Sequence, residues 1–255
     1  MKYLYLIYHW LIAAPILLVL TMLTAIVTII GAQFNDDWWG YYPPKWWCMA
    51  WCTLLGVRVV VKNREKIDAK TQYVFVANHQ GAFDIFSIYG FLGHRFKWMM
   101  RKGLTNIPLV GTACRAAGHI LVDHSSASAV KKTMGDAQKK LERGNSIVVF
   151  PEGRRSDDGH LQPFKHGAFR LATMFRRPIV PISIDGSYKV MPRGSWHAVP
   201  GTITLTIHDP ILPPEKGRHD LNEITERCYE TIKSALAEQE QNTDSHEDRT
   251  DTATQ

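Results

Sequence analysis

The sequence is poor in the residues and spacings that build metal centres and disulfide frameworks. Its 255 residues include four cysteines, and no two of them form a Cys-x-x-Cys pair. They are Cys48, Cys52, Cys114 and Cys228. Isolated cysteines of this kind are typical of buried free thiols in a reducing compartment. We therefore expect neither a bound metal nor a structural disulfide.

The sequence also lacks several phosphate-binding and hydrolase motifs. It has no Gly-x-x-x-x-Gly-Lys-Ser/Thr loop and no Gly-x-Gly-x-x-Gly after a strand, which argues against a nucleotide-binding protein. It has no Gly-x-Ser-x-Gly elbow, which argues against a serine hydrolase. The net charge of +6 and the isoelectric point near 9.1 suit a phosphate-bearing ligand, an anionic membrane surface or nucleic acid, without choosing among them.

What the sequence does have is a long apolar start. Residues 3–32 are almost wholly apolar, interrupted by His9 and Pro15, and about 20 such residues can cross a bilayer. The stretch lacks the polar face of a soluble core helix, and no secretory cleavage site follows it. Residues 38–47 hold six aromatic rings and Lys45, a composition typical of a membrane interface.

Two membrane arrangements fit this N-terminal sequence. A second apolar segment, residues 48–57, is too short to span and precedes a basic stretch. Either the first segment spans once, with the Lys/Arg-rich remainder on the cytoplasmic side, or the two segments form a hairpin that enters one leaflet. Both predict that residues 1–57 attach the protein to the inner (cytoplasmic) membrane, with the rest of the chain facing the cytoplasm. Such attachment argues against a nucleic-acid partner.

Residues 58–238 alternate between strand and helix. Strands are predicted over residues 58–61, 73–77, 96–99, 119–122, 146–150, 179–184 and 203–207. Helices are predicted near residues 84–93, 126–143, 166–176 and 220–238. This alternation favours a single α/β domain, in which helices flank a central core that is mostly β-sheet. Residues 239–255 are polar and lack aromatic rings, which predicts a disordered tail.

One candidate site follows the strand at residues 73–77. His79 can move a proton near neutral pH, and Asp84 follows five residues later. On one continuous helix these two side chains would point ~140° apart. We therefore expect a bend at Gly81, with Asp84 in the first turn of the next helix. The spacing alone is weak, because it recurs in the polar tail. A buried structural histidine followed by a helix-capping aspartate would give the same spacing.

A second candidate site follows the strand at residues 146–150. Pro151 ends this strand, and Gly153 permits an unusual backbone turn. Arg154 and Arg155 come next, and guanidinium groups bind phosphate through paired hydrogen bonds. A surface turn with solvated arginines is the alternative interpretation.

Two lysines could add positive charge to these sites. Lys102 follows the strand at residues 96–99, and Lys165 follows the arginine-bearing loop. In open α/β sheets, ligands gather at the edge where the parallel strands end. We expect both lysines to contribute if their strand ends share an edge with the two candidate loops.

Four motifs stand in the order seen in the glycerolipid acyltransferases. They are Asn78-His79-x-x-x-x-Asp84, Phe150-Pro151-Glu152-Gly153-x-Arg155-Ser156, Phe164-Lys165-x-Gly167 and Ile179-Val180-Pro181-Ile182. Between about residues 40 and 235 the chain most resembles the bacterial 1-acyl-glycerol-3-phosphate acyltransferases, also called lysophosphatidic acid acyltransferases. The ordered set is far more specific than any one of its motifs.

The resemblance implies an activity and a role for each motif residue. His79 would be the general base, and Asp84 would orient it. The residues implied to bind the acceptor's glycerol phosphate are Glu152, Gly153, Arg155 and Ser156. The acceptor would be lysophosphatidic acid, the product phosphatidic acid, and the donor acyl-CoA or acyl carrier protein, with no bound cofactor. The resemblance also implies an aromatic two-helix N-terminal motif that seats the enzyme on the lipid bilayer.

The chain departs from the family pattern at two positions. Arg154 stands where threonine is usual, and His124 replaces the arginine that usually ends an Ile-Asp-Arg motif. The second change removes a permanent cation and leaves other acceptors open, such as glycerol-3-phosphate or a lysolipid without a phosphomonoester. A non-catalytic adaptor that binds anionic lipid is an alternative of another class, but it would not need His79 and Asp84 together.

Overall fold

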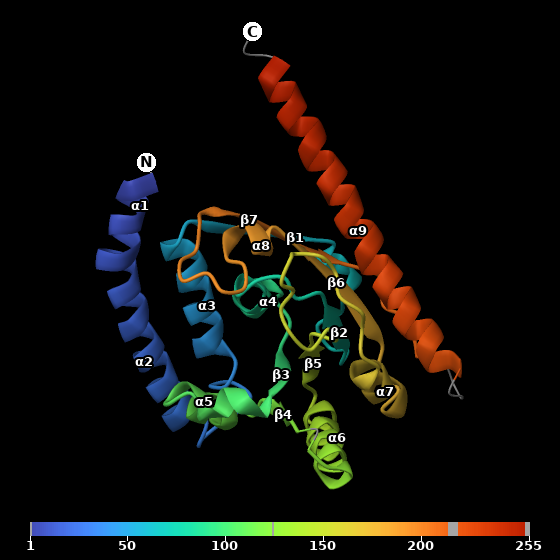
Figure 1. Ribbon diagram of the computed structural model, residues 1–255. Coiled ribbons are helices and arrows are strands. Elements are labelled where there is room, and N and C mark those ends of the chain that lie inside the picture. The colour runs from blue at the N-terminus through green and yellow to red at the C-terminus, as the bar shows by residue number, and fades with distance from the viewer. Residues whose placement is uncertain (1, 124, 214–218, 253–255) are drawn as a thin grey trace.

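A mostly parallel β-sheet forms the centre of the molecule (Figure 1). The computed structural model describes residues 2–123, 125–213 and 219–252, so His124 lies outside the described residues. Within these ranges the strands are β1 (Val57–Lys62), β2 (Val74–Ala77), β3 (Phe96–Arg101), β4 (Ile120–Val122), β5 (Ser146–Val149), β6 (Ile179–Asp185) and β7 (Gly201–Ile207). Each of them corresponds to a strand predicted from the sequence, which confirms the expected α/β fold.

The order of the strands brings the candidate loops to one edge of the sheet. The order is β1-β7-β6-β2-β5-β3-β4, and neighbouring strands are parallel except for β6 and β7. The carboxyl ends of β2, β5 and β3 therefore lie at the same edge. The loops that carry His79, Arg155 and Lys102 begin at these three ends, as the sequence argument required.

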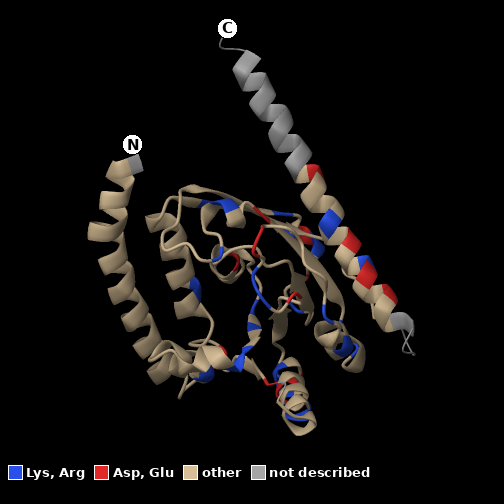
Figure 2. Ribbon diagram, viewed as in Figure 1, with Lys and Arg blue, Asp and Glu red and all other residues tan. Residues whose placement is uncertain are grey.

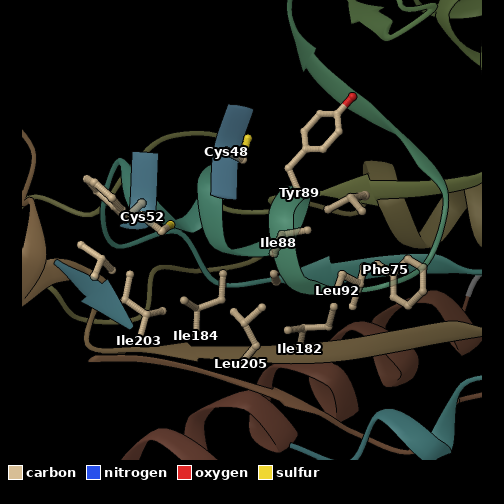
Figure 3. Close-up of a cluster of buried hydrophobic side chains, with 14 of the residues drawn as sticks. Cys48, Cys52, Phe75, Ile88, Tyr89, Leu92, Ile182, Ile184, Ile203 and Leu205 are labelled. Carbon is tan, nitrogen blue, oxygen red and sulfur yellow. The ribbon is translucent and has the colours of Figure 1, made fainter. Parts of the chain in front are cut away.

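Helices cover both faces of the sheet. One face packs against α3 (Tyr42–Leu54) and α4 (Phe83–Phe91), and the other against α6 (Ala127–Glu142), α7 (Gly167–Met174) and α9 (His219–Thr252). Figure 3 shows the buried hydrophobic side chains between the sheet and helices α3 and α4. Cys48 and Cys52 lie there opposite Ile184 and Leu205 of the sheet. Both thiols are free and buried.

Several elements differ from the expectation. The short elements η2 (Arg64–Lys66), η3 (Lys102–Asn106), α5 (Val110–Ala116) and α8 (Ser187–Val190) were missed, because so few residues show no helical period. The predicted tail is a separate case. From residue 239 to Thr252 the backbone continues α9, which projects beyond the sheet (Figure 1). Residues 219–252 contain neither glycine nor proline, and extending a helix is easier than nucleating it.

The N-terminal segment is a long helix with a shorter helix beside it. The long helix consists of α1 (Lys2–Tyr8), the π-helical turn η1 (His9–Ala13) and α2 (Ala14–Gly31), and α3 returns alongside it (Figure 1). Among the described helices, only Tyr3–Gly31 is long and apolar enough to cross a membrane. Just 22% of its most apolar stretch is buried, and Figure 2 shows no charged residue along it.

Both ends of this long helix are fastened to the sheet domain. Near its start, the hydroxyl of Tyr5 donates to the main-chain oxygen of Ala198 at 3.0 Å. Just beyond its end, the fully buried ammonium of Lys97 on β3 donates to the main-chain oxygen of Asp36 at 2.9 Å. The Asp36 carboxylate also pairs with Lys140 of α6 at 3.0 Å. The helix therefore lies along the domain and does not project from it.

Candidate active site

The loop after β2 is held to β6 by a side chain that imitates a backbone pair. Asn78 is fully buried. Its amide N–H donates to the carbonyl of Ile184 at 2.8 Å, and its amide oxygen accepts the N–H of Ile184 at 2.7 Å. Asn78 thus extends the β2–β6 ladder beyond Ala77, the last residue of β2. His79 follows directly and is attached to a rigid support.

His79 and Asp84 form a hydrogen-bonded pair, as the spacing predicted. His79 Nδ1 and Asp84 Oδ2 lie 2.7 Å apart, and Asp84 is fully buried in the first turn of α4. The same Oδ2 accepts the main-chain N–H groups of Gln80 at 2.7 Å and Gly81 at 2.9 Å. Because two main-chain N–H groups already donate to this oxygen, it acts as an acceptor toward His79, and Nδ1 of His79 carries the proton. His79 Nε2 then keeps its lone pair, as a general base requires.

The second oxygen of Asp84 has a partner that the sequence did not indicate. Oδ1 accepts a hydrogen bond from the hydroxyl of Ser187, which is fully buried at the start of α8. Gly81 packs against this serine, and a Cβ on Gly81 would lie 2.5 Å from the Ser187 carbonyl oxygen. Gly81 does not have a positive φ. The bend therefore needs glycine because a side chain at this position would collide with Ser187.

A stack of aromatic rings backs the histidine. The His79 ring lies 4.0 Å from the Phe150 ring, centroid to centroid, at an interplanar angle of 9°. Phe150 in turn stacks on Trp98 of β3 at 5.3 Å and 24°. This wall sets the plane of the imidazole and covers one of its faces. Sequence reasoning assigned no role to either ring, although Phe150 stands in the same motif as the arginines.

The arginine-bearing loop also holds the main chain of the histidine loop. Glu152 is 4% exposed, and its Oε1 accepts the N–H of His79 at 2.7 Å while its Oε2 accepts the N–H of Gln162 at 3.2 Å. Burial raises the pKa of Glu152 to about 8, the charge of Asp84 adds to this, and the two backbone donors oppose it. Ser156 N–H donates to His79 O at 2.8 Å. Both residues thus hold the main chain of His79 in place.

The loop leaves some cations free and neutralises others. Gly153 has φ +79°, which forms the unusual turn that the sequence predicted. A Cβ added at Gly153 would lie 2.7 Å from Lys165 Nζ. Arg154 pairs with Asp157 at 2.9 Å. Within the described ranges, neither Arg155 nor Lys165 makes a side-chain ion pair or hydrogen bond. Of the cations in this loop, these two are available to an anionic ligand.

Lys102 contributes less than expected. It lies at the predicted edge, but its ammonium pairs with Asp123 at 2.9 Å and is 66% exposed. Its charge is therefore compensated by a neighbouring loop. In the part of the chain that the structure describes, no three His, Cys, Asp or Glu side chains gather as a metal site.

Comparison with known proteins agrees with this geometry. The model of the Acyltransferase family matches residues 58–185, half of the chain, and spans the site from His79 through Ser156. The chain is 35% identical over 142 residues to a chloroplastic 1-acyl-sn-glycerol-3-phosphate acyltransferase of Brassica napus, covering 55% of this chain and 41% of that protein. It is 24% identical over 192 residues to the human beta enzyme of the same name, covering 75% and 69%.

A solved structure resembles almost the whole chain. The crystal structure of the 1-acyl-sn-glycerophosphate acyltransferase PlsC from Thermotoga maritima superposes with a TM-score of 0.71 at 28% identity. The superposition covers 88% of this chain and 95% of that one. The chain spans about half the length of the curated relatives it matches first. The fold, the site and the family match agree: this protein belongs to the Acyltransferase family.

Proposed function

We propose that the protein transfers an acyl chain from a thioester to the free hydroxyl of 1-acyl-glycerol-3-phosphate, forming phosphatidic acid. The observation that carries the proposal is the His79–Asp84 pair at 2.7 Å, joined through Glu152 and Ser156 to the loop that bears Arg155. A base and an unpaired guanidinium on adjoining loops suit an acceptor that has both a hydroxyl and a phosphate. Relatives named for this reaction support the same substrate.

The residues account for each proton in the reaction. A thioester is already activated, so no covalent enzyme nucleophile is needed. His79 Nε2 takes the proton of the acceptor hydroxyl as its oxygen attacks the thioester carbonyl, and buried Asp84 stabilises the imidazolium that forms. The tetrahedral intermediate collapses, the C–S bond breaks, and His79 returns the proton to the departing thiolate. Arg155 and Lys165 hold the phosphate so that the hydroxyl stays within reach of the base.

We infer that the protein is seated on one face of a membrane. The helix Tyr3–Gly31 has 29 residues and is about 43 Å long. Tyr5 at one end and the turn at Asp36 beyond the other both contact the sheet domain. A helix that crossed the bilayer would carry one end, with its polar attachments, to the opposite side. The long helix with α3 therefore favours a hairpin in one leaflet over a single span. The Lys/Arg-rich domain would then face the cytoplasm at the inner membrane.

The test is an assay of the purified full chain in detergent with one labelled acyl-CoA, the corresponding acyl carrier protein thioester, and a panel of acceptors. We expect lysophosphatidic acid to be acylated faster than glycerol-3-phosphate or a lysolipid without a phosphomonoester. In His79→Ala, turnover should fall by roughly 10²–10⁴-fold while the protein stays folded and lipid-bound. His208→Ala, in a histidine bonded to Ser183, is the matched control and should keep its activity.

Three results would contradict the proposal in whole or in part. Near-normal turnover in His79→Ala would exclude His79 as the base. Binding to anionic vesicles without any thiol release from either donor would favour the non-catalytic lipid adaptor. A preference for an acceptor without phosphate would keep the chemistry but replace the substrate.

A further inference from the structure

Ser187 reaches the catalytic pair from a distant part of the chain. It lies 103 residues after Asp84, at the start of α8, and its hydroxyl donates to Asp84 Oδ1. The side chain is fully buried. Asp84 Oδ2 is occupied by His79 and by two main-chain N–H groups. Ser187 is therefore the donor that satisfies the remaining oxygen of a buried carboxylate.

The backbone around Ser187 is fixed from several sides. Gly186, directly before it, has φ +84°, and a Cβ there would lie 2.2 Å from the carbonyl oxygen of Thr202. Met191 N–H donates to Ser187 O at 3.0 Å, and Met191 O accepts the N–H of Ala82, in the histidine loop, at 3.2 Å. The serine therefore occupies one place relative to the histidine loop and cannot simply follow Asp84 if that side chain turns.

Because the backbone of Ser187 is fixed, its hydroxyl can restrain the Asp84 carboxylate. A carboxylate rotates easily about its Cβ–Cγ bond, and a rotation would move Oδ2 away from His79 Nδ1. We propose that Ser187 is a positioning residue for the base, holding Asp84 so that Oδ2 meets His79 Nδ1 in the plane set by Phe150. The inference rests on the proposed function of His79. Ser187 itself touches neither the phosphate-binding cations nor the reacting atoms.

Loss of the Ser187 hydroxyl should affect the chemical step and leave acceptor binding unchanged. Without the hydroxyl, Asp84 Oδ1 is buried without a donor, and the carboxylate gains freedom to turn or to admit water. His79 then loses part of its fixed orientation, while Arg155 and Lys165 still bind the acceptor. Removing this hydrogen bond should therefore lower kcat and leave KM nearly unchanged.

The test compares Ser187→Ala with Ser183→Ala. Ser183 lies in β6, is fully buried like Ser187, and bonds His208 outside the site at 2.7 Å, so both variants delete a buried, hydrogen-bonded hydroxyl. We expect Ser187→Ala to lower kcat roughly ten-fold with KM for lysophosphatidic acid changed by less than about two-fold. Ser183→Ala should leave both constants near the wild-type values. Ser187→Thr, which keeps the hydroxyl, should recover most of the lost kcat.

A double-mutant cycle distinguishes positioning from general damage. If Ser187 acts through Asp84, adding Ser187→Ala to Asp84→Ala should change kcat by less than about two-fold. An equal loss of kcat in both backgrounds would overturn the proposal, as would a wild-type kcat in Ser187→Ala. These results differ from a failure of the proposed function, in which the wild-type protein itself would release no thiol with any acceptor.

Discussion

Glu152 Oε1 accepts the main-chain N–H of His79 at 2.7 Å, and this bond joins the two loops of the site. The resemblance to acyltransferases implied that Glu152 contacts the acceptor. Its carboxylate instead faces inward and is satisfied by the N–H groups of His79 and Gln162. The glutamate therefore holds the His79 loop beside the arginine-bearing loop, and its protonation is coupled to the stability of the site.

The first prediction concerns the pH dependence of stability. Because burial raises the pKa of Glu152 from 4.5 to about 8, the folded protein binds more protons than the unfolded chain between these pH values. This group therefore lowers the free energy of unfolding as pH rises through that window. We expect Glu152→Gln to show a smaller decline between about pH 5 and pH 8, measured by chemical denaturation. Glu142→Gln, on the surface of α6, should keep the wild-type slope. Equal slopes in all three proteins would contradict the assignment.

The sequence predicted those parts of the fold that depend on local pattern. β2 and β5 can be recognised in the sequence as short β-branched and apolar runs because they are buried on both faces. His79 and Asp84 can be paired because they lie close together in the sequence. Ser187 could not be found in this way. Its contact with Asp84 exists only because β6 lies beside β2 and Gly186 turns the chain back, and neither fact leaves a local periodicity.

The same limit applies within the arginine-bearing loop. Glu152 and the arginines stand together in one motif, yet Glu152 is buried and Arg154 is exposed, so they have different neighbours. Arg154 and Arg155 are adjacent and chemically identical, but of these two only Arg154 pairs with Asp157, which also pairs with Arg193 among the residues described. Which charge remains free is decided by the shape of the turn at Gly153, and spacing alone does not encode that shape.

The second prediction uses this difference between the two arginines. Removing Arg155 should raise the KM for lysophosphatidic acid, because a hydrogen-bonded guanidinium–phosphate pair contributes roughly 1.5–3 kcal/mol, or about 10- to 100-fold. Arg154→Ala breaks an exposed pair with Asp157 and should change KM much less. Steady-state kinetics with lysophosphatidic acid at saturating donor measures both. Equal effects in the two variants would show that the loop binds phosphate by its overall charge.

The third prediction separates strain from function at Gly153. Alanine at φ +79° is strained by roughly 1–2 kcal/mol, and its Cβ would lie 2.7 Å from Lys165 Nζ, which must move away. Gly144 has nearly the same φ, +82°, with no atom within 4 Å of an added Cβ. Both Gly→Ala variants should lose similar stability on thermal denaturation, but only Gly153→Ala should raise the acceptor KM. A raised KM in Gly144→Ala would mean that the kinetic change follows stability alone.

The fourth prediction tests the membrane-facing surface. Leu18 on α2 is 62% exposed and Leu212, outside the N-terminal segment, is 75% exposed, so glutamate at either position should be tolerated by the fold. Burying a leucine side chain in an apolar phase contributes roughly 1.5–3 kcal/mol, and a carboxylate there is unfavourable. If the long helix lies in one leaflet, Leu18→Glu should weaken sedimentation with anionic vesicles by about ten-fold or more. Leu212→Glu should bind as the wild type does. Equal binding by all three proteins would exclude this face of the helix as the site of membrane contact.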